Sequence, residues 1–303
     1  MVALIKKVKW LVLGGDGQLG RAMNLELSRK SVPFISLNRE QLDITNQRDV
    51  NKWFSEVAPD VVLNAAAWTN VDLAETMRSE ATLVNAEGPK LVATACLEIR
   101  AKFIHISTDY VFSGSKVFPW DEGAIKCPTC VYGETKAEGE ESVLRVHPSG
   151  SFIVRTSWLY SPWGKNFVKT MLKIALKETR SVEVVSDQVG QPTSAIELAS
   201  QIHAVIDAGS SPGIYHGTNS GQVSWFGLSQ YIFELVGADP SRVIAVDSKR
   251  FPSKVARPAY SVLGHTRWIE EGLEAMKDWR ESLKDSLPEI LNSLEQKEVL
   301  LEN

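Results

Sequence analysis

The sequence predicts an α/β protein built on a doubly wound parallel sheet, with a smaller lobe toward the C-terminus. Three observations support this prediction: short apolar runs alternate with helical patterns, the runs contain few polar residues, and a glycine-rich turn follows the first run. Strands that alternate with helices in this way pair in parallel through right-handed crossovers. Strands that are apolar throughout are typical of a sheet covered by helices on both faces.

The expected elements follow in order along the chain. Strands are expected at 8–13, 34–37, 61–66, 103–107 and 152–156, with helices at 18–29, 47–57, 80–99 and 133–145. The pattern then loosens into a helix at 167–177, a strand at 182–185, a helix at 195–208, a strand at 213–218 and a mostly helical stretch at 225–303. We expect one lobe over 1–157, to which 192–220 returns, and a second lobe over 158–191 and 221–303.

Composition narrows the class of protein. The 303 residues carry a net charge of −4, so no basic excess indicates a nucleic-acid partner. The apolar run after Lys9 is too short for a signal segment, and no stretch approaches the ~18 apolar residues of a membrane span. Three cysteines are typical of a reducing compartment, so we expect a cytoplasmic protein without a membrane partner.

The glycine-rich turn predicts a dinucleotide site of the Rossmann type. Gly14, Gly17 and Gly20 follow the first expected strand, and Gln18 and Leu19 open the helix. Glycine lets the backbone turn sharply and approach a diphosphate, which the free N–H groups of the helix start attract. Such a triplet also occurs in ordinary turns, but its place directly after the first strand favours the nucleotide site.

The end of the second strand indicates which cofactor binds. An acid usually stands there to meet the ribose 2′-hydroxyl, whereas this chain has Leu37-Asn38-Arg39. Arg39 could meet a 2′-phosphate, which favours NADPH and leaves NADH possible. Alternatively, Arg39 is a surface charge.

Tyr132 and Lys136 form a Y-x-x-x-K pair on one face of an expected helix. An ammonium about 4 Å from the phenol would lower the pKa of Tyr132 by roughly three units, which suits an acid–base group. Thr108 follows the fourth expected strand, and its hydroxyl could join Tyr132 on a substrate carbonyl oxygen. The alternatives are a solvated helix face for the pair and a turn cap for Thr108.

With these motifs the sequence resembles the extended short-chain dehydrogenase/reductase family and, within it, the dTDP-4-dehydrorhamnose reductases. The resemblance covers residues 8–275. Besides the glycine turn and the Tyr/Lys pair, it rests on the segments 42–45, 64–72, 107–112, 155–158, 187–193 and 257–261. The last three are the more specific, because they belong to the substrate lobe.

The resemblance implies roles for individual residues. It places Asp43 and Ile44 on the adenine, and Ala66, Ala67 and Thr69 along the cofactor cleft. It makes Tyr132 the proton donor, with Lys136 as its partner and Thr108 as the third member. On the substrate side it implies contacts from Val71, Asp109, Trp158, Asn166 and Arg257, the last with the diphosphate. Trp158 could instead be core packing, and Arg257 an ion pair.

The sequence departs from the family pattern at a few positions. Ser113-Gly114 replaces Asp-Gly after Tyr-Val-Phe, and Ala137 replaces Leu after Lys136. Some members dimerise through a magnesium-binding glutamate whose position here is Ala22, so we expect no metal. Cys127 and Cys130 lack the further ligands of a zinc site, and a disulfide between them stays a minor hypothesis.

The function that the resemblance implies is reduction of the 4-keto group of a dTDP-linked 6-deoxy sugar, with dTDP-4-dehydro-L-rhamnose as the expected substrate. Another dTDP-keto sugar, such as a streptose-type intermediate, stays open. A dehydratase is disfavoured because Tyr110 stands where that class needs an acid. A non-catalytic NADP-binding subunit, like the β subunit of methionine adenosyltransferase, is the alternative of another class. We expect a monomer or a homodimer.

Overall fold

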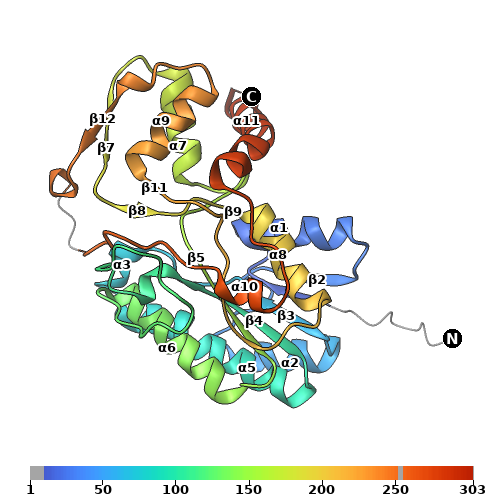
Figure 1. The fold of residues 1–303 in the computed structure, drawn as a ribbon. Coiled ribbons are helices and arrows are strands. Elements are labelled where there is room, and N and C mark those ends of the chain that lie inside the picture. The colour runs from blue at the N-terminus through green and yellow to red at the C-terminus, as the bar shows by residue number, and fades with distance from the viewer. Residues whose placement is uncertain (1–9, 252–254, 303) are drawn as a thin grey trace.

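The computed structural model describes residues 10–251 and 255–302, with side chains described up to residue 296. Its six-stranded sheet and flanking helices occupy the lower part of Figure 1, and a smaller group of helices and short strands lies above them. The first strand, β1, is described from Trp10 to Leu13. Val8 and Lys9, where we expected it to begin, lie outside the described residues, as does most of the segment weighed as a signal.

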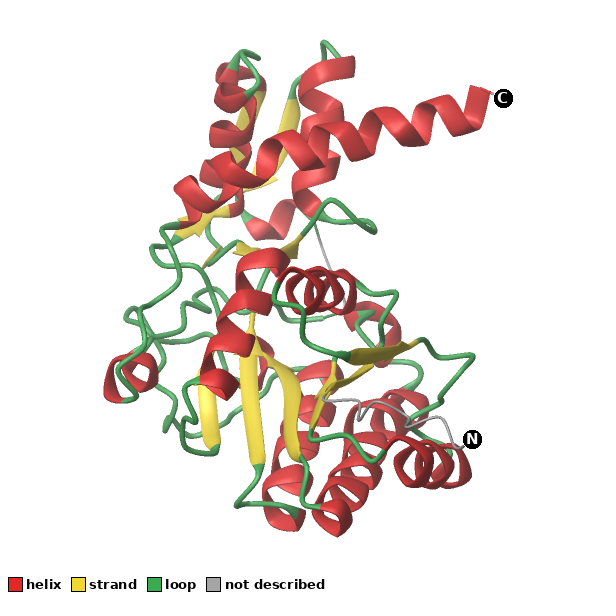
Figure 2. Cartoon of the chain, turned by 90° about the vertical axis from the view of Figure 1, so that its right-hand side faces the viewer, coloured by secondary structure: helices red, strands yellow, loops and turns green. Residues whose placement is uncertain are grey.

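The central sheet confirms the predicted fold class. All of its strands pair in parallel, and it runs in the order β10 (Gly213–His216), β5 (Ser151–Thr156), β4 (Lys102–Thr108), β3 (Val61–Asn64), β1, β2 (Phe34–Leu37). Figure 2 shows the strands side by side with helices on both faces. The chain turns outward from β1 to β2 and then returns to β3 on the other side. The carboxyl ends of β1 and β3 therefore form the switch point where ligands bind in such sheets.

Helices cover both faces of the sheet because strand residues point alternately to the two sides. Trp10 and Val12 pack with α1 (Gln18–Arg29) and α8 (Ala195–Asp207). Leu11 and Leu13 pack with the helices of the opposite face, which are α2 (Gln47–Val57), α5 (Gly88–Ile99) and α6 (Val131–Val146). This double burial explains the uniformly apolar strands.

A separate apolar cluster holds the smaller group together. It joins α7 (Phe167–Lys177), α9 (Trp225–Leu235) and α11 (Trp279–Glu302) with the parallel pair β7 (Val182–Val185) and β12 (Val243–Val246). The prediction of a mostly helical stretch over 225–303 was wrong at β12, because this short β-branched run completes a pair with β7, which lies far away in the sequence.

Several short elements complete the described secondary structure. They are the pairs β6 (Leu159–Tyr160) with β9 (Thr193–Ser194) and β8 (Val189–Gly190) with β11 (Val223–Ser224), the helices α3 (Val71–Ala74) and α10 (Thr266–Glu270), and the 3-10 turns η2 (Asp109–Val111), η3 (Pro240–Arg242) and η4 (Ser248–Arg250).

Two predicted elements differ from the structure near the switch point. The strand expected over 61–66 ends at Asn64, whose side-chain oxygen accepts the N–H of Ala66 and turns the backbone. The helix expected over 80–99 begins earlier, as α4 (Arg78–Thr82), and passes through a π-helical turn, η1 (Leu83–Glu87), before α5. A π turn inside a helix is often found at a functional site.

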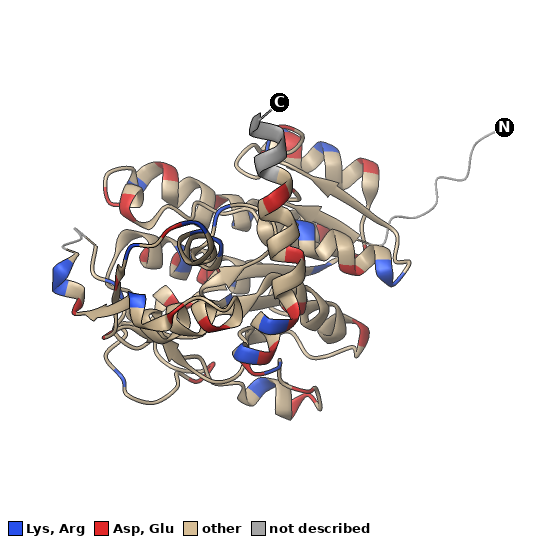
Figure 3. Cartoon of the chain, turned by 90° about the horizontal axis from the view of Figure 1, so that it is seen from above, with Lys and Arg blue, Asp and Glu red and all other residues tan. Residues whose placement is uncertain are grey.

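Charged side chains of both signs are interspersed over the described surface. In the view of Figure 3, Lys and Arg alternate with Asp and Glu along the helices and loops. Among the described helices, none is both long and apolar enough to cross a membrane.

Candidate active site

A cavity of about 660 Å³ opens at the carboxyl ends of β1, β3, β4 and β5. It brings together most of the residues that the sequence singled out, from segments spread between the first strand and the end of β5. Its lining includes Gly14, Gly17, Gln18, Leu19, Arg39, Asp43, Ile44, Ala66, Ala67, Thr69, Val71, Thr108, Asp109, Tyr132, Lys136 and Trp158. Of the remaining candidates, Gly20 packs beneath the cavity, and Asn166 and Arg257 lie outside its lining.

The glycine turn leaves room for a backbone approach that side chains would block. Gly14 has φ +79°, and a Cβ atom there would lie 2.7 Å from the backbone nitrogen of Ala66. A Cβ on Gly20 would overlap the carbonyl oxygen of Gly14. Gly17 caps α1 without a side-chain hydrogen bond, and the first turn of α1 holds no acid. The free N–H groups and positive end of α1 therefore fit a diphosphate.

The rim of the cavity beyond β2 carries Arg39. Its guanidinium is exposed, and its Nε lies 3.8 Å from Oδ2 of Asp43. Asp43 also accepts hydrogen bonds from the backbone and hydroxyl of Thr45 through Oδ1. Ile44 is buried against Gly88, where a Cβ would come within 2.9 Å of its Cγ1. This edge thus offers a cation beside an apolar wall, which suits a phosphate-bearing adenosine.

Tyr132 and Lys136 both line the cavity from α6, and their side chains have different partners. Lys136 is buried, and its Nζ donates to the carbonyl oxygen of Ile106 at 2.6 Å, on the side of β4. Tyr132 is half-buried, with its ring edge-on to that of Tyr110 at 5.5 Å between centroids.

The expected lowering of the pKa of Tyr132 by Lys136 is wrong for this structure. Burial raises the pKa of Tyr132 above its ordinary value, a hydrogen bond with Thr108 opposes the rise, and the charge of Asp109 adds to it. Burial also lowers the pKa of Lys136 to about 8, which the carboxylate of Glu140 partly offsets. The physical reason is that burial favours the neutral form of both groups, while the Lys136 nitrogen donates to a backbone carbonyl.

Thr108 and Asp109 form a short hydrogen-bonded unit at the end of β4. The Thr108 hydroxyl donates to Oδ1 of Asp109 at 2.9 Å and accepts the N–H of Tyr110 at 3.2 Å, so it also caps the turn. Asp109 is buried, and its Oδ2 has no hydrogen-bond partner. Burial raises the pKa of Asp109 to about 6, against hydrogen bonds from Ser261 and Thr108.

Trp158 lies where the cavity meets the smaller group of elements. Its φ is +45°, which is rare for an aromatic residue, and its ring stacks on Trp225 with 3.4 Å between centroids. A Cβ on Gly190 would come within 2.7 Å of the Trp158 ring. Backbone strain held by tight packing is typical of residues that border a ligand site.

The two outlying candidates occupy different places. Arg257 lines a neighbouring cleft of about 1200 Å³, which Trp225 also lines, and its Nη2 lies 3.3 Å from Oδ2 of Asp72. Asn166 caps α7 by accepting the N–H of Lys169, and its amide donates to Oε1 of Gln18. Through these two hydrogen bonds, Asn166 joins the start of α7 to the start of α1.

Sequence reasoning missed Asn85, which lies in the π turn η1. Its side chain accepts the N–H of Trp68 and donates to the carbonyl of Trp68 and the hydroxyl of Thr135, which ties the cavity wall to α6. The sequence did carry a signal for Asn85. An asparagine is unfavourable among the apolar residues of a helix, so its presence there indicates a specific role.

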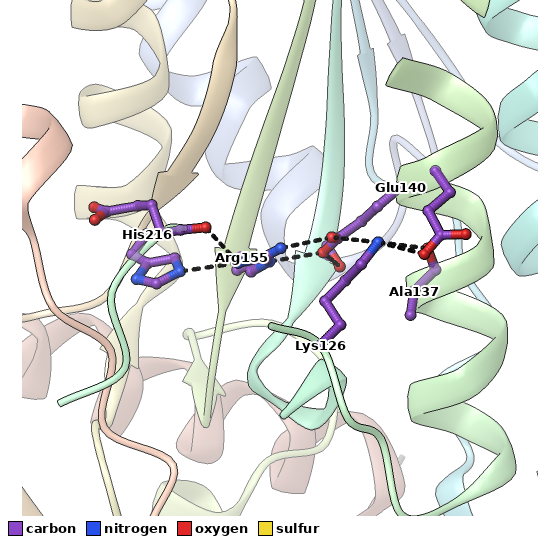
Figure 4. A network of polar contacts seen from close by, with 8 residues as sticks. Lys126, Ala137, Glu140, Arg155 and His216 are labelled. Atoms are coloured by element: carbon purple, nitrogen blue, oxygen red, sulfur yellow. Dashed lines mark hydrogen bonds and ion pairs between the residues drawn. The ribbon is translucent and has the colours of Figure 1, made fainter. Parts of the chain in front are cut away.

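Sequence reasoning also missed a buried ion pair beneath the cavity, between Glu140 of α6 and Arg155 of β5. Figure 4 shows the guanidinium of Arg155 against the carboxylate of Glu140, with His216 on one side and Lys126 on the other. Both Glu140 oxygens accept from Arg155 at 2.8 Å, and Ser107 donates to Oε1 at 2.6 Å. Since Ser107 precedes Thr108 and Glu140 lies one turn after Lys136, this network supports the elements that carry the site.

The chain is similar to known proteins along most of its length. Residues 8–292 match the family described as "RmlD substrate binding domain". A "dTDP-4-dehydrorhamnose reductase" of Streptomyces griseus is 43% identical over 93% of this chain and 94% of its own. A "dTDP-4-keto-6-deoxy-D-glucose reductase" of Streptomyces niveus is 41% identical over 94% and 98%. A solved dTDP-4-dehydrorhamnose reductase of Bacillus anthracis, in complex with NADP, aligns with a TM-score of 0.89 at 37% identity, over 94% and 100%.

Proposed function

The chain belongs to the RmlD substrate binding domain family, and from this premise we propose that it reduces the 4-keto group of a dTDP-linked 6-deoxy sugar with NADPH. The observation that carries the proposal is the single cavity in which Thr108, Tyr132 and Lys136 meet the glycine turn. The relatives named above include reductases of dTDP-keto sugars, one of them solved with NADP.

The residues of the cavity fit the cofactor. The glycine turn and the start of α1 would hold the diphosphate, Arg39 the 2′-phosphate, Asp43 and Ile44 the adenosine, and Lys136 the nicotinamide ribose. Ala66, Ala67 and Thr69 would line the cleft. When bound, NADPH supplies the hydride that reduces the ketone.

Tyr132 would donate the proton that the sugar oxygen takes up. The phenol lines the cavity beside Thr108, so both hydroxyls can hydrogen-bond one carbonyl oxygen. Because its pKa is raised, Tyr132 is protonated at neutral pH and holds the proton that the reduction needs. Asp109, Val71 and Trp158 would border the sugar ring, and Arg257 would meet the diphosphate of the substrate at the neighbouring cleft.

The sugar itself is a finer question. We propose dTDP-4-dehydro-L-rhamnose, and the Streptomyces niveus relative, named for a different keto sugar, supports a second candidate substrate of the same class. Contacts with single hydroxyls decide between such sugars. We also propose a cytoplasmic enzyme, which the three free cysteines support, and a monomer or homodimer.

The test follows NADPH oxidation with a panel of dTDP-keto sugars. We expect turnover with the 4-keto-6-deoxy sugars, and we expect Tyr132→Phe to lower kcat by about 10²-fold or more while NADPH still binds. Tyr231→Phe is the matched control, because the Tyr231 hydroxyl donates to the carbonyl oxygen of Arg280 in the smaller group and does not line the cavity.

Two results would reject the proposal. Equal rates for wild type and Tyr132→Phe would remove the phenol from the reaction. Tight NADPH binding without turnover of any keto sugar would indicate a non-catalytic binding subunit instead.

A further inference from the structure

Three buried polar side chains form a row behind the cavity, from β3 through β4 to α6. Nδ2 of Asn64 lies 3.3 Å from Nδ1 of His105, and Nε2 of His105 lies 3.4 Å from Nζ of Lys136. All three are at most 1% exposed. Buried polar groups are almost always hydrogen-bonded, so each contact in the row should pair one donor with one acceptor.

The far end of the row determines its direction. The backbone N–H of Ala66 can only donate, and it points at Oδ1 of Asn64 at 3.1 Å. The amide group of Asn64 is therefore oriented with Nδ2, a donor, toward His105. Nδ1 of His105 must accept that hydrogen bond, so it carries no proton.

The ring then presents its proton to Lys136. Burial holds the pKa of His105 well below its ordinary value, so the ring is neutral and has one N–H. With Nδ1 unprotonated, the proton lies on Nε2 and faces Nζ of Lys136. An ammonium group has no lone pair to accept it, whereas a neutral amine has one.

We propose that Asn64 and His105 are positioning residues that hold Lys136 as a neutral amine while its nitrogen lies against β4. In this form Lys136 accepts from His105 and still donates to the carbonyl oxygen of Ile106. An ammonium would meet a second donor at His105. In the other tautomer of His105, the proton on Nδ1 would face the donor Nδ2 of Asn64, so two donors would meet there instead.

The charged groups around Lys136 leave both forms accessible. The carboxylate of Glu140 favours the ammonium, but Arg155 and Ser107 bind that carboxylate and Lys126 lies 3.7 Å from it. Burial favours the amine and lowers the pKa of Lys136 to about 8, which brings the amine within reach of near-neutral pH. Position and charge are thereby linked: Lys136 gains its proton more readily when its nitrogen leaves His105.

The inference rests on the proposed function only where it gives Lys136 a role in the reaction. Its first test therefore needs neither sugar nor cofactor. Nitrogen-15 NMR of the five histidines, with His105 assigned by its loss in a variant, reports the tautomer in the wild-type protein. We expect a neutral His105 with its proton on Nε2 at pH 7.5. A proton on Nδ1, or on both nitrogens, would overturn the proposal.

The second test measures the charge of Lys136. The Cε resonance of carbon-13-labelled Lys136, assigned by its absence in Lys136→Met, is followed against pH in His105→Phe. Loss of the opposing N–H should raise the ratio of ammonium to amine at fixed pH by about tenfold, one pKa unit. An unchanged or lower ratio would overturn the proposal.

The control variant is His147→Phe. His147 is also buried, but its Nε2 contacts the carbonyl oxygen of Ala101, so the Lys136 titration should stay as in wild type. In the keto-sugar assay the limb of the pH profile that depends on Lys136 should move to higher pH in His105→Phe alone. If no sugar is turned over while the NMR results hold, only the proposed function fails.

Discussion

Arg155 and Glu140 meet through two parallel hydrogen bonds of 2.8 Å, and both side chains are at most 1% exposed. The pair joins β5 to α6 directly beneath the residues that border the cavity. Burying two charges is costly, and here the bidentate geometry with a third bond from Ser107 offsets that cost.

Breaking this pair should destabilise the protein strongly. We expect Glu140→Gln and Arg155→Met each to lower the free energy of unfolding by about 3–5 kcal/mol, because each leaves a buried charge without its partner. Urea denaturation measures the change. The exposed pair Lys277–Asp285 is the control, where Lys277→Ala should cost less than about 1 kcal/mol. Similar small losses at both sites would contradict this account of the buried pair.

Gly14 tests the close approach at the glycine turn. Gly14→Ala should weaken NADPH binding and lower stability, because the new Cβ would strike the backbone of Ala66 as well as straining a φ of +79°. Gly237→Ala isolates the strain, since Gly237 has φ +71° and its Cβ would meet nothing within 4 Å. It should cost about 1 kcal/mol and leave cofactor binding unchanged. Equal behaviour of the two variants in a fluorescence titration with NADPH would refute the steric argument.

Arg39 tests the choice of cofactor. We expect Arg39→Ala to weaken NADPH binding about tenfold or more, because a charge-assisted hydrogen bond to a phosphate is worth about 1.5–3 kcal/mol, and to leave NADH binding unchanged. Arg29→Ala, an exposed arginine at the end of α1, should change neither affinity. A parallel loss for NADPH and NADH would place Arg39 outside the 2′-phosphate site.

Asp109 should make stability depend on pH. Its folded pKa of about 6 lies above the usual 3.8, so the folded state binds more protons between these values. The contribution of Asp109 to the free energy of unfolding is therefore fully present below the unfolded pKa of 3.8, and it is lost as the pH rises through the folded pKa of about 6. Relative to Asp109→Asn, the wild type should lose on the order of 3 kcal/mol between pH 4 and 7. Urea denaturation at a series of pH values checks this, and a constant difference would contradict the raised pKa.

Local patterns predicted the elements that carry the cofactor site. The bounds of α1, β2, α2, α7 and β7 agree with the expected ranges, because caps, apolar periodicity and glycine positions act over a few residues. The glycine turn and the segments around Thr108 and Tyr132 were likewise predicted, and the structure brings them to one cavity.

What the sequence did not predict depends on contacts between distant residues. β12 became a strand by pairing with β7, and the π turn at Asn85 satisfies Trp68 and Thr135. The spacing of Tyr132 and Lys136 placed both on one helix face. It could not show that the nitrogen of Lys136 would donate to the carbonyl oxygen of Ile106.

The position of β10 at the edge of the sheet has a consequence for biosynthesis. β10 pairs with β5, but α7, β7 and α8 lie between these two strands in the sequence. A nascent chain that has just completed β5 therefore still lacks β10, and the hydrogen-bonding edge of β5 is exposed. Unpaired apolar edges invite aggregation. We expect a fragment that ends after Thr156 to be poorly soluble. For the same reason, we expect a soluble cofactor-binding half to require the chain as far as β10.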